Sequence, residues 1–422
     1  MPEAIQLSES VPCRGDFDVI VAGGGVAGIA AALAARRQGK KVLLIEKGVL
    51  LGGLATIGLI NLFVPMCNGH GRQIIRGMAE ELLRLSIRYG YDSIPEDWRN
   101  GEPEKPTMQR YCTKYSPQIF ALALAELLNA EGIDLRFDSV VTLPVMDGAH
   151  CNGLVVESKS GREYFAARMV VDATGDADIL YRAGVPTVQG KNYFTYTGHI
   201  ISLESCSAAV AAGNIQKAIF RCYGGNATLY GKNHPAAMPL WDGVTAEEIS
   251  RYLVLSQIET LQRIRGEDRI SREIITLPGM AQFRTTRHID GDYTLGVKDQ
   301  YCHFEDSVGA ICDFDQRGIL YEIPYRALVR SGYDNLITAG RCASGEGYAW
   351  DVLRVIPPAI LSGQAAGNAV SLALDLGRPI YDIDIAALQS SLEKDDVMIH
   401  FNDEWIKDAD RDSASDSGVE HF

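Results

Sequence analysis

The chain has 422 residues, of which 46% are hydrophobic, 22% charged and 8% aromatic. This composition is typical of a globular protein with room for two domains, and it excludes disorder of the whole chain. The net charge of −14 argues against a nucleic-acid backbone as partner. Nine scattered cysteines without a Cys-x-x-Cys pair argue against zinc and iron–sulfur sites, so no metal site is expected.

The first 50 residues contain a strand, a glycine-rich turn and a helix. An apolar run over residues 17–22 stops at GGGVAG, and an alanine-rich helix follows to about Gln38. The turn has G-x-G-x-x-G spacing. Gly23 allows the tight turn, Gly25 lets the backbone approach a pyrophosphate, and Gly28 lets the helix pack closely on the strand. The start of the helix offers free N–H groups to phosphates, so the pattern predicts a dinucleotide site.

A second apolar strand over residues 42–45 ends at Glu46, 18 residues after Gly28. A carboxylate at this place accepts hydrogen bonds from an adenosine ribose and repels a 2′-phosphate. A glycine-rich turn without a ligand is the alternative interpretation. The complete order of strand, turn, helix, strand and acid favours the ligand.

A second glycine pair, Gly52-Gly53, follows the ribose acid, with Leu54 to Gly58 after it. A cofactor whose second half continues past the pyrophosphate needs close backbone approach there, which glycine permits. This feature favours FAD over NAD.

His70 follows these glycines in the segment CNGHGR. A histidine in a glycine-rich loop near the flavin is a candidate general base or a point of covalent flavin attachment. A loop histidine satisfied by neighbouring groups is the alternative.

Later apolar strands each end in small residues. One follows the helix stop at Gly132, one ends at Ala173-Thr174-Gly175, and one over residues 336–339 ends at Gly340-Arg341. Together they predict one parallel sheet whose carboxyl edge meets one ligand. Pro357-Pro358 then begin a helix whose N-terminus, preceded by Arg354, is expected to face the flavin.

Between residues 185 and 323 the pattern changes to short β-rich and helical segments, which predicts a substrate domain inserted into the cofactor fold. Arg284, Arg287 and His288 lie within five residues there. One interpretation is an anion- or polyol-binding edge, with Arg287 as a clamp and His288 as acid or base. The other is that one arginine pairs with Asp290 or Asp292 and the other faces solvent.

The ordered set of the glycine turn, Glu46, GGLAT, VVDATGDAD, RTTRHIDGDY and AGRCAS…RVIPPAILSGQAAG resembles the FAD-dependent oxidoreductase family of the glutathione-reductase-type, two-dinucleotide-fold clan. The flavin subunit of heterodisulfide reductase is similar, but this chain lacks its cysteine clusters. The resemblance covers roughly residues 16–380 and implies noncovalently bound FAD. The implied cofactor contacts are Gly23, Gly25, Val26, Ala27, Gly28, Glu46, Lys47, Gly53, Leu54, Ala55, Thr56, Gly58, Val140, Ala173, Thr174, Gly175, Gly340, Arg341, Arg354 and Val355.

One departure from the family pattern stands after the last strand. Relatives often have His-Glu in the loop after Gly-Arg-Cys-x-Ser, and this chain has Gly347-Tyr348. The substrate role of that pair is therefore not carried over. Tyr348 becomes a candidate determinant of a different substrate.

The resulting prediction is an α/β fold with a Rossmann-like FAD domain, comprising a parallel sheet, helices and a β-meander, and an inserted α+β substrate domain. The expected boundaries are 15–184 and 324–390 for the FAD domain, 185–323 for the inserted domain and 391–422 for an acidic, partly disordered tail.

The predicted function is hydride transfer between flavin N5 and a polyol, sugar, hydroxy acid or enoate. Non-redox FAD binding, thiazole-synthase-like nucleotide remodelling and flavin-dependent RNA modification are the alternatives. Only one dinucleotide fingerprint is present, so the electron acceptor stays open, as does homo-oligomerisation. No secretion signal and no membrane span are evident, so a cytoplasmic location is expected.

Overall fold

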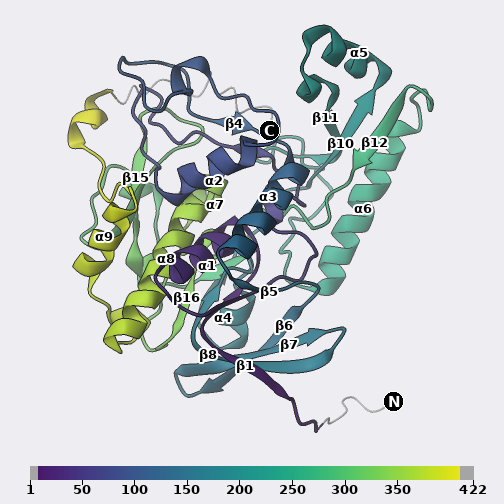
Figure 1. The fold of residues 1–422 in the computed structure, drawn as a ribbon. Coiled ribbons are helices and arrows are strands. Elements are labelled where there is room, and N and C mark those ends of the chain that lie inside the picture. The colour runs from purple at the N-terminus through teal and green to yellow at the C-terminus, as the bar shows by residue number, and fades with distance from the viewer. Residues whose placement is uncertain (1–7, 409–422) are drawn as a thin grey trace.

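A parallel sheet forms the centre of the protein in the computed structural model, which describes residues 8–408 (Figure 1). Its five parallel strands lie in the order β5-β2-β1-β8-β16. Their bounds are Asp134–Arg136, Val42–Ile45, Cys13–Ala22, Gly161–Asp172 and Leu336–Thr338. The expected strands over residues 42–45 and 336–339 are thereby confirmed.

A β-meander extends the sheet beside β8. The strands β6 (Val140–Asp147) and β7 (His150–Ser158) pair antiparallel with each other, and β7 pairs antiparallel with the first half of β8. The second half of β8 pairs with β1 and β16. A parallel sheet with this meander confirms the predicted fold class.

Two helices, α1 (Val26–Arg37) and α8 (Ile356–Leu376), pack closely against each other on one face of the sheet. Alanines and glycines make this contact. A Cβ atom on Gly363 would overlap the carbonyl oxygen of Ala27, and one on Gly367 would overlap that of Ala31. Glycine at these two positions therefore allows the two helices to approach each other closely.

The alternation of side chains along β1 fills two cores. Val19 and Val21 belong to the core under α1 and α8, whereas Ile20 and Ala22 belong to the core on the other face. That second face is covered by α4 (Asp178–Arg182) and by the meander. Burial on both faces is the reason that the strand is apolar throughout.

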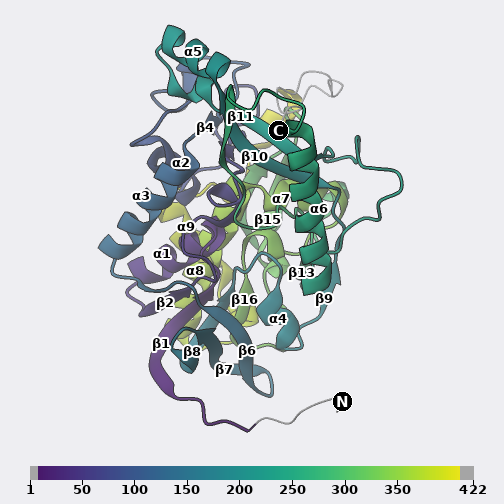
Figure 2. The same cartoon turned by 90° about the vertical axis from the view of Figure 1, so that its right-hand side faces the viewer.

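A second sheet stands apart from the first, at the end of the molecule opposite the meander (Figures 1 and 2). It consists of β10 (Thr195–Ser202) between β11 (Phe220–Asn226) and β12 (Arg272–Thr276). The helix α6 (Ala246–Ile264) packs on it and α5 (Leu203–Ala212) follows β10. A small separate core lies beneath, formed by Phe194, Trp241, Tyr252 and Phe283. We call this part, residues 187–289, the cap.

The remaining elements connect or flank these layers. Their bounds are Leu62–Phe63 (β3), Met78–Ile87 (α2), Thr113–Lys114 (β4), Pro117–Ala130 (α3), Thr187–Gln189 (β9), Arg287–Ile289 (β13), Ser307–Cys312 (β14), Leu320–Pro324 (β15), Gly347–Arg354 (α7) and Ile385–Lys394 (α9). No helix within residues 8–408 combines the length and the apolar character needed to cross a bilayer.

The packing differs from two of the expected boundaries. The hairpin β14–β15 was placed in the inserted domain, but its side chains join the same core as α8. Residues 391–401 were placed in the tail, yet Val397, Ile399 and Phe401 are buried in that core. The amide of Ala310 in β14 also donates to Met398 O at 2.7 Å. Of the expected tail, residues 409–422 lie outside the described part of the chain.

Candidate active site

A cavity of about 1100 Å³ lies where the carboxyl edge of the large sheet meets the cap. It is larger than the usual ligand pocket of about 300–1,000 Å³. Residues at the ends of four parallel strands line it, namely Ala22, Ile45, Ala173 and Ala339. Two of the three strands expected to share one ligand, those before Ala173 and Ala339, therefore open into one space, whereas β5 does not line it.

The glycine turn after β1 forms one wall. Gly23 has a φ of +110°, which suits glycine, and its amide donates to Ile45 O at 2.8 Å. A Cβ on Gly28 would overlap the Gly23 carbonyl oxygen, so Gly28 holds the turn against α1 and does not line the cavity. Gly25, in contrast, lines the cavity, and a Cβ there would meet nothing within 4 Å. The turn thus leaves space in front of the free N–H groups of α1, which suits a pyrophosphate.

Glu46 lines the same end of the cavity. Its Oε2 accepts from the Gly24 amide at 2.7 Å, and its Oε1 accepts from the Gly48 amide at 2.6 Å. These bonds fix the carboxylate and use one acceptor site on each oxygen, which leaves a second site on each for a ribose hydroxyl. Lys47 and the half-exposed Val140 line the cavity beside it.

The second glycine pair lies against the first, because the Gly52 amide donates to Gly24 O at 2.8 Å. Gly53, Leu54 and Ala55 line the cavity here, but Thr56 and Gly58 do not. Thr56 is buried and its hydroxyl donates to Leu51 O. These two residues therefore shape the loop from behind.

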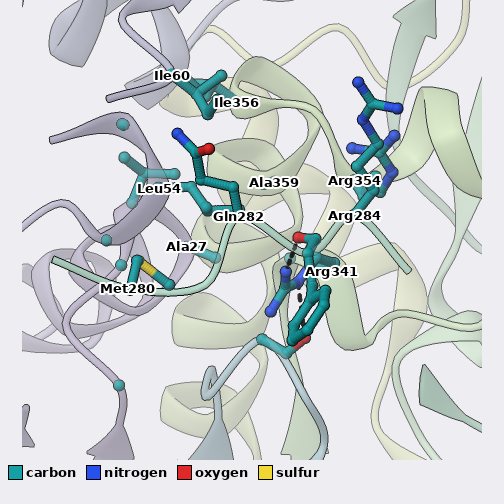
Figure 3. Close-up of a pocket in the computed structure, with 18 of the residues that line it drawn as sticks. Ala27, Leu54, Ile60, Met280, Gln282, Arg284, Arg341, Arg354, Ile356 and Ala359 are labelled. Atoms are coloured by element: carbon teal, nitrogen blue, oxygen red, sulfur yellow. Dashed lines mark hydrogen bonds between the residues drawn. The ribbon is translucent and has the colours of Figure 1, made fainter. Parts of the chain in front are cut away.

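Arg341 connects three loops around the far end of β16. Its Nε donates to Gly175 O at 2.8 Å, its Nη2 pairs with Asp176 Oδ1 at 2.7 Å, and its Nη1 donates to Phe283 O. The side chain is only 9% exposed. Arg341 is thus held by the protein and fixes the Gly175 loop beside the cavity (Figure 3).

Most of the residues expected to contact the cofactor are on this wall. The lining includes Gly23, Gly25, Val26, Ala27, Glu46, Lys47, Gly53, Leu54, Ala55, Val140, Ala173, Thr174, Gly175, Gly340, Arg341, Arg354 and Val355. Gly28, Thr56 and Gly58 lie behind it. An open backbone turn, a fixed ribose-type acid and a long cavity fit a dinucleotide cofactor.

The four expected catalytic residues do not line the cavity. Arg287 is 8% exposed, pairs with Asp178 at 2.7 Å and lies over the Tyr181 ring at 4.1 Å. The alternative expectation, pairing with Asp290 or Asp292, is wrong, because the loop after β8 comes closer. Arg287 joins β13 to α4 and its role as a clamp stays a prediction.

His288 is buried in β13 at 2% exposure. Its Nδ1 lies 2.6 Å from Ile289 O, and its ring stands edge-on to Trp350 with centroids 4.4 Å apart. Burial lowers the pKa of His288, so the ring is neutral near neutral pH. An acid–base role for it stays a prediction.

His70 and Tyr348 also lie outside the lining. Within residues 8–408 the buried Nε2 of His70 has no hydrogen-bond partner, and both its catalytic role and its role as a loop histidine stay predictions. Tyr348 donates to Asp313 Oδ1 at 2.8 Å and stacks on Tyr230, which does line the cavity. Tyr348 therefore contacts the cavity wall through Tyr230 and Phe314.

The cap supplies lining residues that the sequence did not single out. They come from β10, from the segment after β11 and from the loop between β12 and β13, and include Thr195, Thr197, Tyr230, Met280, Gln282 and Phe283. Arg284, one of the three basic residues in RTTRH, lines the cavity as well. The segment MAQF just before Arg284 combines apolar side chains with an amide, and it is the sequence feature that could have indicated these lining residues. We call this side of the cavity, together with Phe314, Asp315 and Arg354, the cap half, and the glycine-lined side the cofactor half.

One cluster elsewhere brings three potential metal-ligating side chains together, His303, Glu322 and His400, with their ligand atoms within 4.8 Å of one another. They hydrogen-bond to one another: His303 Nδ1 lies 2.6 Å and His400 Nδ1 3.0 Å from Glu322 Oε1. None of the three lines the cavity.

The sheet order, the meander and the glycine-lined wall define a dinucleotide-binding flavoprotein of the doubly wound α/β class. The chain belongs to the FAD-dependent oxidoreductase family, whose model matches residues 18–214 and 215–392. FAD is therefore its cofactor and oxidation–reduction its chemistry. The resemblance seen in the sequence is confirmed at the level of the family.

Three solved structures are similar to most of the chain at low sequence identity. p-Nitrophenol 4-monooxygenase from Pseudomonas putida is 12% identical, with 94% of this chain and 92% of that chain covered and a TM-score of 0.47. A geranylgeranyl bacteriochlorophyll reductase-like protein from Thermoplasma acidophilum is 15% identical, with 94% and 96% covered and a TM-score of 0.43. A flavoprotein/dehydrogenase from Cytophaga hutchinsonii is 14% identical, with 90% and 84% covered and a TM-score of 0.43. No curated protein matches the sequence.

Proposed function

We propose that this enzyme transfers a hydride between FAD and a small organic substrate held in the cap half of the cavity. The observation that carries the proposal is the two-sided wall. One side is main chain at the ends of parallel strands and suits a dinucleotide, and the other is side chains from the cap and suits a second molecule.

Bound FAD supplies the acceptor or donor of the hydride. The chain's own contribution in the cap half begins with shielding from water. Met280, Phe283 and Phe314 line the cavity with apolar surface, and Gln282 beside them is only 5% exposed. Exclusion of water strengthens every electrostatic contact with the substrate.

The start of α8 adds positive potential beside the cap half. Val355, Ile356 and Arg354 line the cavity there. A helix N-terminus stabilises a nearby negative charge by about 0.3–1 kcal/mol. This wall therefore favours negative charge that develops during reduction.

A tyrosine–aspartate pair is our candidate for proton transfer. The Tyr230 hydroxyl lies 3.1 Å from Asp315 Oδ2, and both residues line the cap half. Tyr230 is 66% exposed, and partial desolvation together with the Asp315 charge raises its pKa to about 12, so the hydroxyl keeps its proton at neutral pH. The hydroxyl has a single proton, which is directed to Asp315 in this structure, so Tyr230 acts on a substrate by turning this O–H from Asp315 to a substrate oxygen.

Anaerobic flavin spectroscopy tests this function. The holoenzyme, oxidised or photoreduced, is mixed with hydroxy acids, enoates, sugars and cyclitols while the visible flavin band is followed. We expect one class to reduce or reoxidise the flavin, and we expect Tyr230→Phe to slow that step without changing flavin occupancy. A fully occupied flavin that no compound in the four classes oxidises or reduces would contradict the proposal.

A further inference from the structure

Two arginines lie side by side in the cap half, away from Leu54 and Ile60 (Figure 3). Arg284 belongs to the loop between β12 and β13, and Arg354 is the last residue of α7. Both line the cavity. Their elements are far apart in sequence, so the fold itself brings the two guanidinium groups together.

The pair carries more positive charge than its neighbours balance. Asp351 bonds to Arg354, with Oδ1 2.9 Å from Nε, and no carboxylate contact is recorded for Arg284 among the described residues. The net charge of Arg284, Arg354 and Asp351 together is therefore +1. Burial, and then the charge of Arg354, lower the pKa of Arg284 to about 10, so it is still protonated at neutral pH.

Arg284 also has an unused donor. Its Nη1 is buried and has no hydrogen-bond partner in the described structure. A buried charged donor without a partner is costly, and a ligand oxygen removes that cost. Arg221 and Lys232 also line the cavity there, as does Asp315, whose negative charge offsets one of theirs.

We infer that Arg284 and Arg354 form the subsite for a carboxylate of the substrate. A guanidinium fork matches the two oxygens of a carboxylate, and the single excess charge matches a monoanion. The cofactor's phosphates do not fill this need, because the glycine turn that suits them lies in the other half of the cavity. The inference rests on the proposed function and narrows its substrates to hydroxy acids and enoates.

Binding measurements on the oxidised holoenzyme test the subsite. Lactate and crotonate are titrated in parallel with lactamide and crotonamide, and the flavin spectrum reports binding. We expect the acids to bind at least tenfold more tightly than the amides. Arg284→Gln is expected to weaken the acids by about 10- to 100-fold and to leave the amides and the flavin content unchanged.

Arg263→Gln is the matched control, because this exposed arginine on α6 removes the same charge away from the cavity. It should change neither affinity. If Arg284→Gln does not fold, Arg284→Lys replaces it, because lysine keeps the positive charge and loses the guanidinium fork. We expect this variant to lose less acid affinity than Arg284→Gln and still to bind the acids more tightly than the amides.

These experiments distinguish a failure of the carboxylate subsite from a failure of the proposed function. Equal affinities for acids and amides, or a variant that loses flavin affinity while acid binding is unchanged, would overturn the subsite and assign the arginines to the cofactor. Turnover of an uncharged sugar or cyclitol without acid binding would leave the proposed function intact and overturn only this inference. Acid binding that depends on Arg284 without any flavin reduction or reoxidation would support the subsite and overturn the proposed function.

Discussion

The two halves of the cavity are built by different means. The cofactor half is mostly main chain, fixed by glycines at strand ends and by hydrogen bonds such as Gly52 to Gly24. The cap half is mostly side chains, which several segments far apart in the sequence bring together. The comparison teaches that recognition of the nucleotide needs space and amide groups, whereas recognition of the substrate needs particular side chains. Mutations should therefore act differently in the two halves.

The largest effect is expected at Gly25. Gly25→Val adds side-chain volume where the structure leaves open space, so we expect loss of FAD affinity by at least about 100-fold, or about 2.8 kcal/mol. The unfolding free energy of the FAD-free protein should change little. Flavin titration followed by fluorescence measures the first quantity, and urea unfolding the second.

Gly266→Val is the control for this substitution, because Gly266 also has nothing within 4 Å but lies outside the cavity lining. It should keep full flavin occupancy. If Gly25→Val also keeps it, the glycine turn is not the pyrophosphate site and the distinction between the halves fails.

Acid should affect the cap through His199 in β10. Burial, and then Arg221, lower the pKa of His199 to about 4 in the folded state, against about 6.5 when unfolded. The unfolded chain binds more protons between these values, so stability is present above pH 6.5 and is lost as pH falls towards 4. We expect a loss of about 2 kcal/mol between pH 7 and pH 5 from this group.

His199→Gln should remove that part of the pH dependence. Urea unfolding at pH 7 and pH 5 measures it, with tryptophan fluorescence as the signal because Trp241 lies in the cap core. Identical pH slopes in the variant and the unmodified enzyme would show that the acid-sensitive group is elsewhere.

Gln282 joins the two halves, and its removal should have a smaller effect. Its Nε2 donates to Gly58 O at 2.7 Å and to Thr197 O at 3.1 Å, and its Oε1 accepts from the Thr197 amide at 2.7 Å. Gln282→Ala leaves these buried groups unpaired, so we expect a loss of about 1–3 kcal/mol in unfolding free energy.

Gln282→Glu should not rescue the loss, because a carboxylate has no donor for the two carbonyl groups at neutral pH. Gln262→Ala on the exposed side of α6 is the control. Thermal unfolding of the four proteins compares them. Equal midpoints for Gln282→Ala and the control would show that the halves are held together in another way.

The smallest effect is expected at Tyr348. Tyr348→Phe removes the hydrogen bond to Asp313 but keeps the ring against Tyr230, so kcat/KM should fall by less than about tenfold. Tyr348→Ala removes the stack as well and should have the larger effect. A loss of activity in the phenylalanine variant as complete as in the alanine variant would indicate a direct chemical role for the hydroxyl.

The sequence predicted the sheet and the cofactor half well because both follow from local patterns. Residues 42–45 are apolar and lie before Glu46, and Gly23, Gly25 and Gly28 occur at a spacing that only one turn geometry explains. Each of these features is set by neighbours in the chain.

The cap half could not be predicted in the same way. Arg284, Arg287 and His288 are close in sequence, but Arg284 lines the cavity, whereas Arg287 turns to Asp178 and His288 to Trp350. That separation is decided by the loop after β8 and by α7, which are far away in the chain. The spacing of the three residues contains no information about it.

The single amide of Gln282 has one further consequence. The loop that carries Gly58 shapes the cofactor half, and Thr197 belongs to the central strand of the cap sheet. The Gly279 amide, which donates to Ile57 O at 2.9 Å, links the same loop to the cap through the main chain. We therefore expect flavin loading to order the loop and the cap strand together.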